Sequence, residues 1–161
     1  MSNNISSIKT IEDKKKYDIL KDRYVETINS FIDFAKEKDM IPPQYTPHLA
    51  ILESLISIDK NKLIQGGLDY ILKNKEKVLS YSTVDVDENI NDVLELKKKF
   101  KGAYGMDIMI EILQCTKKLS LEEKTLIHNY IEIFVLILDK INDLIIQCIN
   151  KEKDLKSSYF N

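Results

Sequence analysis

The strongest pattern in the chain is a run of apolar residues at helical spacing between positions 120 and 156. It opens with Ser120-Leu121-Glu122-Glu123, which reads as a capping box: the serine hydroxyl accepts from the amide three residues on, and Glu123 reaches back to the Ser120 amide. The apolar residues that follow alternate at intervals of three and four: Ile127, Tyr130, Phe134, Ile137, Ile141, Leu144 and Cys148. This spacing predicts one uninterrupted helix, roughly 45–55 Å long at 1.5 Å per residue.

A second apolar stripe, Ile131, Leu138 and Ile145, runs beside the first. A helix packed on one side needs an apolar face of only about a third of its circumference. The predicted helix is therefore either the centre of the domain or a donor of one face to a protein partner or a second copy, and both could hold at once. The residues expected at such a partner interface are Ile131, Phe134, Ile137, Leu138, Ile141 and Ile145.

A membrane span is not expected from the same helix. Glu132, Asp139, Lys140 and Asp143 interrupt its apolar run well before the ~20 residues that are needed to cross a bilayer.

The same periodicity predicts five further helices, at about 12–38, 47–58, 60–79, 89–101 and 106–118. Pro42-Pro43 ends the first, and Thr46 and Asp59 are the expected N-caps of the second and third. Gly66-Gly67 lies inside the third, where it predicts a close approach of another helix or a kink. Residues 1–11 are expected to fray, and 157–161 to form a polar tail. The fold class is therefore all-α: a single domain at 12–156, with five to six helices packed as an irregular bundle and long first and last helices.

Composition supports this class. The chain has 161 residues, 43% hydrophobic and 31% charged, which suits one folded domain. Four glycines and three prolines are too few for the many turns of a sandwich or barrel. The net charge of −2 gives no global attraction to nucleic acid or an anionic membrane.

Lysine dominates the basic residues, because Arg23 is the sole arginine. This bias, with frequent Ile and Asn, is typical of AT-rich genomes such as those of many large DNA viruses, some protists and some low-GC bacteria. It disfavours sites built on bidentate phosphate recognition, where arginine is preferred. Cys115 and Cys148 lie among apolar residues and are expected to be buried free thiols in a reducing, cytoplasmic compartment. A disulfide between them is left open.

One short motif points to a partner. Pro42-Pro43-Gln44-Tyr45 matches the P-P-x-Y pattern that WW domains bind through a polyproline turn and an aromatic ring. The alternative is a turn between two helices, with Tyr45 packed inward.

A second segment combines lysines with aromatic residues. Lys97, Lys98, Lys99 and Lys101 surround Phe100 and precede Tyr104, so the segment could contact phosphates while a ring stacks on a base. The alternative is a solvated helix end, in which Gly102 is the cap and Phe100 enters the core.

Residues 100–113 are similar to the glycine-bearing helix junction of viral B-cell-lymphoma-type apoptosis inhibitors, which are helical domains of comparable size. The family's Asn-Trp-Gly-Arg core is absent, because this chain reads Ala103-Tyr104-Gly105-Met106. The resemblance implies a groove that binds a partner helix, and it does not assign the chain to that family.

Catalytic and metal motifs are not found. His48 and His128 have no metal-ligand spacing to other ligands on their helices, and Asp85, Asp87 and Asn89 begin a calcium-loop pattern that the next residues do not continue. We expect no enzyme activity and no cofactor. The favoured function is a non-enzymatic helical scaffold or adaptor that acts through protein–protein contacts, as part of a larger, for example viral, assembly. The alternatives are a lysine-rich nucleic-acid-binding accessory protein and a regulator that binds a partner helix in a groove.

Overall fold

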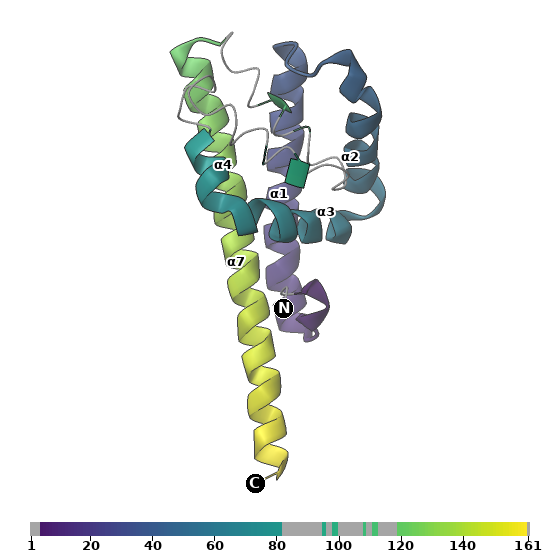
Figure 1. Cartoon of the computed structure of the whole chain (residues 1–161). Helices are drawn as coiled ribbons and strands as arrows, with labels where there is room; N and C mark the ends of the chain where they lie inside the picture. The colour runs from purple at the N-terminus through teal and green to yellow at the C-terminus, as the bar shows by residue number, and fades with distance from the viewer. Residues whose placement is uncertain are drawn as a thin grey trace.

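The computed structural model describes residues 4–81, 95, 98–99, 108, 111–112 and 119–160. Nearly all of these residues are helical, and none of them lies in a β-strand. The predicted all-α class, with long first and last helices, is confirmed. Figure 1 shows the two long helices side by side, with most of the shorter helices packed around the upper part of the pair in this view.

The long helices are α1 (Ile11–Glu37) and α7 (Leu121–Phe160), and they run antiparallel. The Lys38 ammonium lies 3.5 Å from Glu123 near one end of the pair, and Lys9 lies 3.1 Å from Glu152 near the other. Because α7 has 40 residues and α1 has 27, α7 continues past the start of α1 (Figure 1). The expected polar tail at 157–161 is instead helical as far as residue 160.

The start of α7 is the capping box that the sequence predicts. The backbone amide of Glu123 donates to the Ser120 hydroxyl oxygen at 3.2 Å, and the Ser120 amide donates to Glu123 Oε1 at 3.4 Å. These reciprocal bonds satisfy two of the amides that a helix start leaves without partners.

The end of α1 is a C-terminal capping turn that the sequence does not predict. Asp39 takes φ 52°, and its amide donates to Lys36 O while the Met40 amide donates to Ala35 O. This is the Schellman pattern, which usually has glycine at the left-handed position, although short polar residues also adopt it. Met40 is then buried against the core, so the chain turns back before Pro42-Pro43.

A series of short helices returns from this turn toward α7. Its elements are η2 (Pro43–Tyr45), α2 (Thr46–Ile58), α3 (Lys60–Gly66), η3 (Gly67–Ile71), η4 (Leu72–Asn74) and α4 (Lys75–Tyr81). Asp59 is the N-cap of α3, as predicted, because its side chain accepts from the Lys62 amide. Thr46 is not an N-cap. It lies inside α2, and its hydroxyl donates to Pro43 O.

The glycine pair marks a close contact and a change of helix type. A Cβ atom on Gly67 would lie 2.6 Å from Tyr24 Oη and 2.9 Å from Leu138 Cδ2. The predicted close approach is therefore confirmed at Gly67, with both α1 and α7 as neighbours. From Gly67 the chain forms a π-helical turn, and α3 and α4 run in different directions (Figure 1).

The N-terminal segment also differs from its prediction. The Asn4 side chain accepts from the Ser6 amide and caps η1 (Ile5–Ser7). Ile8 is buried and Thr10 caps α1, which starts at Ile11. Residues 4–11 are thus not frayed, because this segment covers apolar surface.

The core is centred on aromatic side chains between α1 and α7. Phe134 makes edge-to-face contacts with Tyr24 and Phe31, at ring-centroid distances of 5.7 and 5.4 Å. Ile108 and Ile112 are buried too, and they line an apolar space shared with α1, α2 and α7.

Candidate functional site

The six residues predicted to form a partner interface on α7 are buried within the chain itself. Their exposed fractions are 0% to 6% for Ile131, Phe134, Ile137, Leu138, Ile141 and Ile145. The prediction of an available interface at these positions is wrong. Both stripes are covered because α1 packs along α7 and the η3–α4 segment contacts α7 as well. The alternative of a central helix is the one observed.

The outer side of α2 carries apolar residues that the fold leaves in solvent. Of the apolar residues of α2, only Leu52 is fully buried, whereas Ile51 and Ile58 are 51% and 83% exposed. Leu55, partly buried, lies between them at helical spacing. We call Ile51, Leu55 and Ile58 the outer face of α2. The sequence did not lead us to predict this face, although the i, i+4, i+7 spacing was a signal for it.

The P-P-x-Y segment forms the turn between α1 and α2. Pro42 is extended, but Pro43–Tyr45 is a 3-10 turn. The Tyr45 ring packs partly against the core and lies 5.1 Å from the His48 ring. WW domains bind an extended polyproline conformation, which Pro43 and Tyr45 do not adopt here. The alternative prediction, a turn with Tyr45 inward, matches this geometry.

The lysine segment is described only in part. Lys98 and Lys99 are exposed, and Lys99 pairs with Glu95 at 3.9 Å. Lys97, Phe100, Lys101 and Tyr104 lie outside the described residues, so the phosphate contact stays a prediction. The incomplete calcium-loop pattern at 85–89 and Cys115 also lie outside the described residues, and most of the junction at 100–113 does too.

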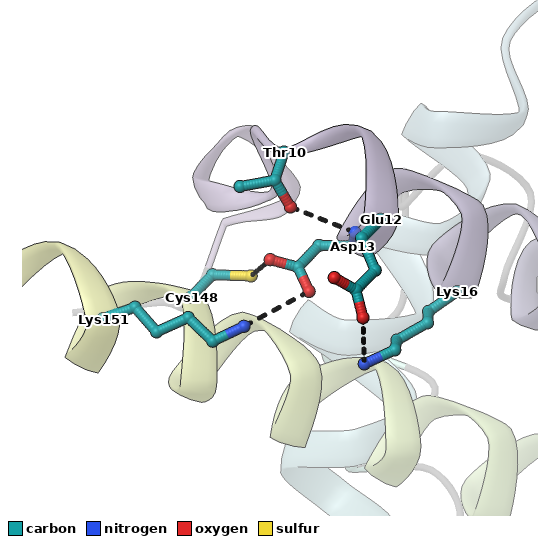
Figure 2. A network of polar contacts seen from close by, with 6 residues as sticks. All are labelled: Thr10, Glu12, Asp13, Lys16, Cys148 and Lys151. Carbon is teal, nitrogen blue, oxygen red and sulfur yellow. Dashed lines mark hydrogen bonds and ion pairs between the residues drawn. The ribbon is translucent and has the colours of Figure 1, made fainter.

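A polar cluster around the buried carboxyl of Asp13 joins the start of α1 to α7 (Figure 2). Asp13 is only 2% exposed, and its backbone amide donates to Thr10 Oγ1 at 3.1 Å. The Cys148 thiol donates to Asp13 Oδ2 at 3.4 Å, and Lys151 Nζ lies 3.5 Å from Asp13 Oδ1. Thr10, Asp13, Cys148 and Lys151 are called the polar cluster below.

The charge state of the polar cluster follows from these contacts. The Thr10 hydroxyl, the Cys148 thiol and the Lys151 ammonium hold the pKa of the Asp13 carboxyl below its ordinary value, against the opposing effect of burial. Burial and the bond to Asp13 raise the pKa of the Cys148 thiol. A protonated, buried thiol is a poor nucleophile, and the contacts of the cluster link the start of α1 to α7.

The prediction of a buried free thiol at Cys148 is confirmed. The carboxylate partner of this thiol was not predicted. The signal was present, because Thr10-Ile11-Glu12-Asp13 has the spacing of a capping box. Spacing cannot show that the acidic residue also faces a helix more than a hundred positions away.

In the part of the chain that is described, no group of three or more His, Cys, Asp and Glu residues could hold a metal ion. His128 Nε2 lies 2.8 Å from Glu132 Oε1 on its own helix. Within the same residues, no helix has the length and apolar character that crossing a membrane requires.

Comparison with known proteins adds no relative. No protein-family model matches the chain, and no match was found among the curated proteins or the solved structures.

Proposed function

We propose that the protein is a non-enzymatic helical scaffold or adaptor, and that a partner protein docks on the outer face of α2. The observation that carries the proposal is the composition of α2 in its place on the surface. Its 13 residues include one charged side chain, Glu53, and that carboxylate is engaged by Lys36 at 2.7 Å. Surface helices normally carry polar and charged residues on the side that faces water.

The spacing of this face suits a helical partner. Ile51, Leu55 and Ile58 fall at i, i+4 and i+7, the anchor pattern by which helices pack into one another. Apolar area that is removed from water contributes roughly 25 cal/mol per Å². Two largely exposed isoleucines can therefore contribute to an interface without any loss to the core, whose contacts Leu52 provides from the other side of the helix.

The test compares two pairs of outward apolar residues. Ile51→Asp with Ile58→Asp alters the outer face, and Leu126→Asp with Leu136→Asp alters two exposed positions on α7, which are 40% and 55% exposed. Sedimentation of the purified protein measures self-association. Affinity capture from the native cell, followed by rebinding of the purified partner, measures association with another protein.

The expected result is that the α2 variant loses the complex while the α7 variant keeps it, with unchanged helical circular dichroism in both. A wild-type chain that is monomeric and binds no purified partner contradicts the proposal, as does a complex that survives the α2 variant. A shift of single-stranded nucleic acid that weakens steeply with salt would favour the accessory-protein alternative instead.

A further inference from the structure

A surface hollow of about 560 Å³ lies where the N-terminal segment, α1 and the start of α3 meet. We call it the α1–α3 hollow. Its apolar lining comes from Ile5, Ile8 and Tyr17, and its size is that of a small-molecule site. The polar side chains that matter for its chemistry are Asn4, Lys14, Lys21, Asn61 and Lys62.

Two asparagine side chains of the hollow use their oxygens in hydrogen bonds within the protein, which leaves their NH2 groups as donors for a ligand. Asn61 Oδ1 accepts from the Tyr17 hydroxyl at 2.7 Å, and Asn4 Oδ1 accepts from the backbone amide two residues on at 2.9 Å. Each side-chain oxygen thus accepts a hydrogen bond within the protein, and the amide NH2 groups of Asn4 and Asn61 remain as donors. Gln65 engages both ends of its amide within the protein.

The charged side chains of the lining also favour a negatively charged ligand. Asp18 Oδ1 lies 3.1 Å from Lys21 Nζ, and Asp59 Oδ1 accepts from the Lys62 backbone amide at 3.1 Å. Both carboxylates keep their negative charge, and the lining sets three ammonium groups, those of Lys14, Lys21 and Lys62, against them. The Lys14 ammonium makes no hydrogen bond or ion pair to the described residues. The lining therefore has an excess of one positive charge, and the side-chain amides of Asn4 and Asn61 add donors to it.

We propose that the α1–α3 hollow binds a small organic phosphate. A phosphate group has three strong acceptor oxygens and up to two negative charges, which matches several donors converging from three elements. Lysine binds phosphate as a point charge and needs no bidentate geometry. The apolar lining receives the organic part of the ligand. This site is independent of the outer face of α2, and neither proposal rests on the other.

Phenyl phosphate is the probe, and calorimetric titration of the full chain is the measurement. We expect saturable binding with a Kd of about 1 mM or tighter, weaker binding of benzoate and inorganic phosphate, and none of phenol. The test variant is Lys14→Ala with Lys62→Ala. Lys153→Ala with Lys156→Ala is the matched control, since it removes the same charge from exposed positions of α7.

The test variant is expected to weaken binding at least about tenfold, and the control variant is expected to leave it unchanged. Lys14→Gln, which keeps most of the side-chain stem, repeats the measurement if the double variant is unfolded by circular dichroism. Absence of saturable binding to the wild type overturns the proposal. Equal weakening in test and control variants overturns it too, because binding would then follow net charge and not the hollow.

Discussion

Tyr24 has the one buried side-chain polar atom, within the described part of the chain, that makes no hydrogen bond. Its ring is part of the aromatic core, and its hydroxyl lies against Gly67 at the contact of α1, η3 and α7. A buried hydroxyl without a partner has lost its bonds to water and gained nothing in exchange. Burial accordingly raises the pKa of this phenol, so the side chain stays neutral.

We therefore expect Tyr24→Phe to leave the free energy of unfolding unchanged or to raise it by up to about 1 kcal/mol. Tyr17→Phe is the matched control, because the Tyr17 hydroxyl donates to Asn61 at 2.7 Å; it should lower stability by roughly 0.5–1.5 kcal/mol. Urea unfolding of both variants measures the difference. A clear loss of stability in Tyr24→Phe would show that its hydroxyl has a partner in solution.

Asp13 makes the stability of the fold depend on pH. The folded-state pKa of its carboxyl is below the ordinary value, through the Thr10 hydroxyl, the Cys148 thiol and the Lys151 ammonium. The stabilisation is fully present above the pKa of the unfolded chain and is lost as pH falls through the folded-state pKa. The pKa values of Glu123 and Glu152 are lowered too, by Ser120 and Lys9 respectively. Their contributions to stability are likewise lost as the pH falls.

The variant Asp13→Asn isolates the part of this pH dependence that comes from the polar cluster. We expect the variant to be less stable than the wild type at neutral pH, and the gap to narrow below about pH 4, where the wild-type carboxyl takes up its proton. Urea unfolding over a series of pH values checks this. Parallel stability curves for the two proteins across the whole series would exclude a role for the Asp13 charge.

Helix α7 shows how one element can be wholly apolar on one side and still tolerate change on the other. Leu138 is fully buried, but Leu136, only two positions earlier, is 55% exposed. An unpaired carboxylate in the core costs several kcal/mol, whereas most surface substitutions stay within about 0.5 kcal/mol. The sequence pattern alone left open whether Leu138 faces the core of the chain or a partner.

Accordingly, Leu138→Asp is expected to unfold the domain or to lower its stability by more than about 3 kcal/mol, while Leu136→Asp is expected to keep both helicity and melting temperature. Thermal unfolding followed by circular dichroism distinguishes the two. If Leu138→Asp melts like the wild type, the central position of α7 is refuted.

The whole molecule is a helical body with a projecting end. Glu152 of α7 pairs with Lys9 of the N-terminal segment, and the α7 side chains described beyond Glu152 are exposed. Figure 1 shows this end of α7 standing clear of the other elements. An isolated helix end has little stability of its own in water, because packing supplies most helical stability in proteins.

Deletion of residues 153–161 is therefore expected to change the free energy of unfolding by no more than about 0.5 kcal/mol. Deletion of 145–161 is the control; it also removes Ile145 and Cys148, which are buried, and should prevent stable folding. Denaturant unfolding measures both. A large loss from the shorter deletion would place the projecting end within the cooperative body.

Local signals in the chain predicted local structure well. The capping box at Ser120, the N-cap at Asp59 and the stop before Pro42-Pro43 were read directly, because each depends on residues a few positions apart. The form of the turn that ends α1 was not predicted. Asp39 takes a conformation that usually signals itself by glycine, and only the buried Met40 contact explains why the chain turns there.

Periodicity by itself determined that this protein is all-α, that its two longest helices are α1 and α7, and which side of each is apolar. Tertiary structure alone decided what covers those sides. The stripes of α7 would read the same whether α1 or another subunit packed on them, because hydrophobic burial is non-directional. The meeting of Asp13 with Cys148, the donor-rich α1–α3 hollow and the uncovered outer face of α2 likewise depend on residues that only folding brings, or fails to bring, together.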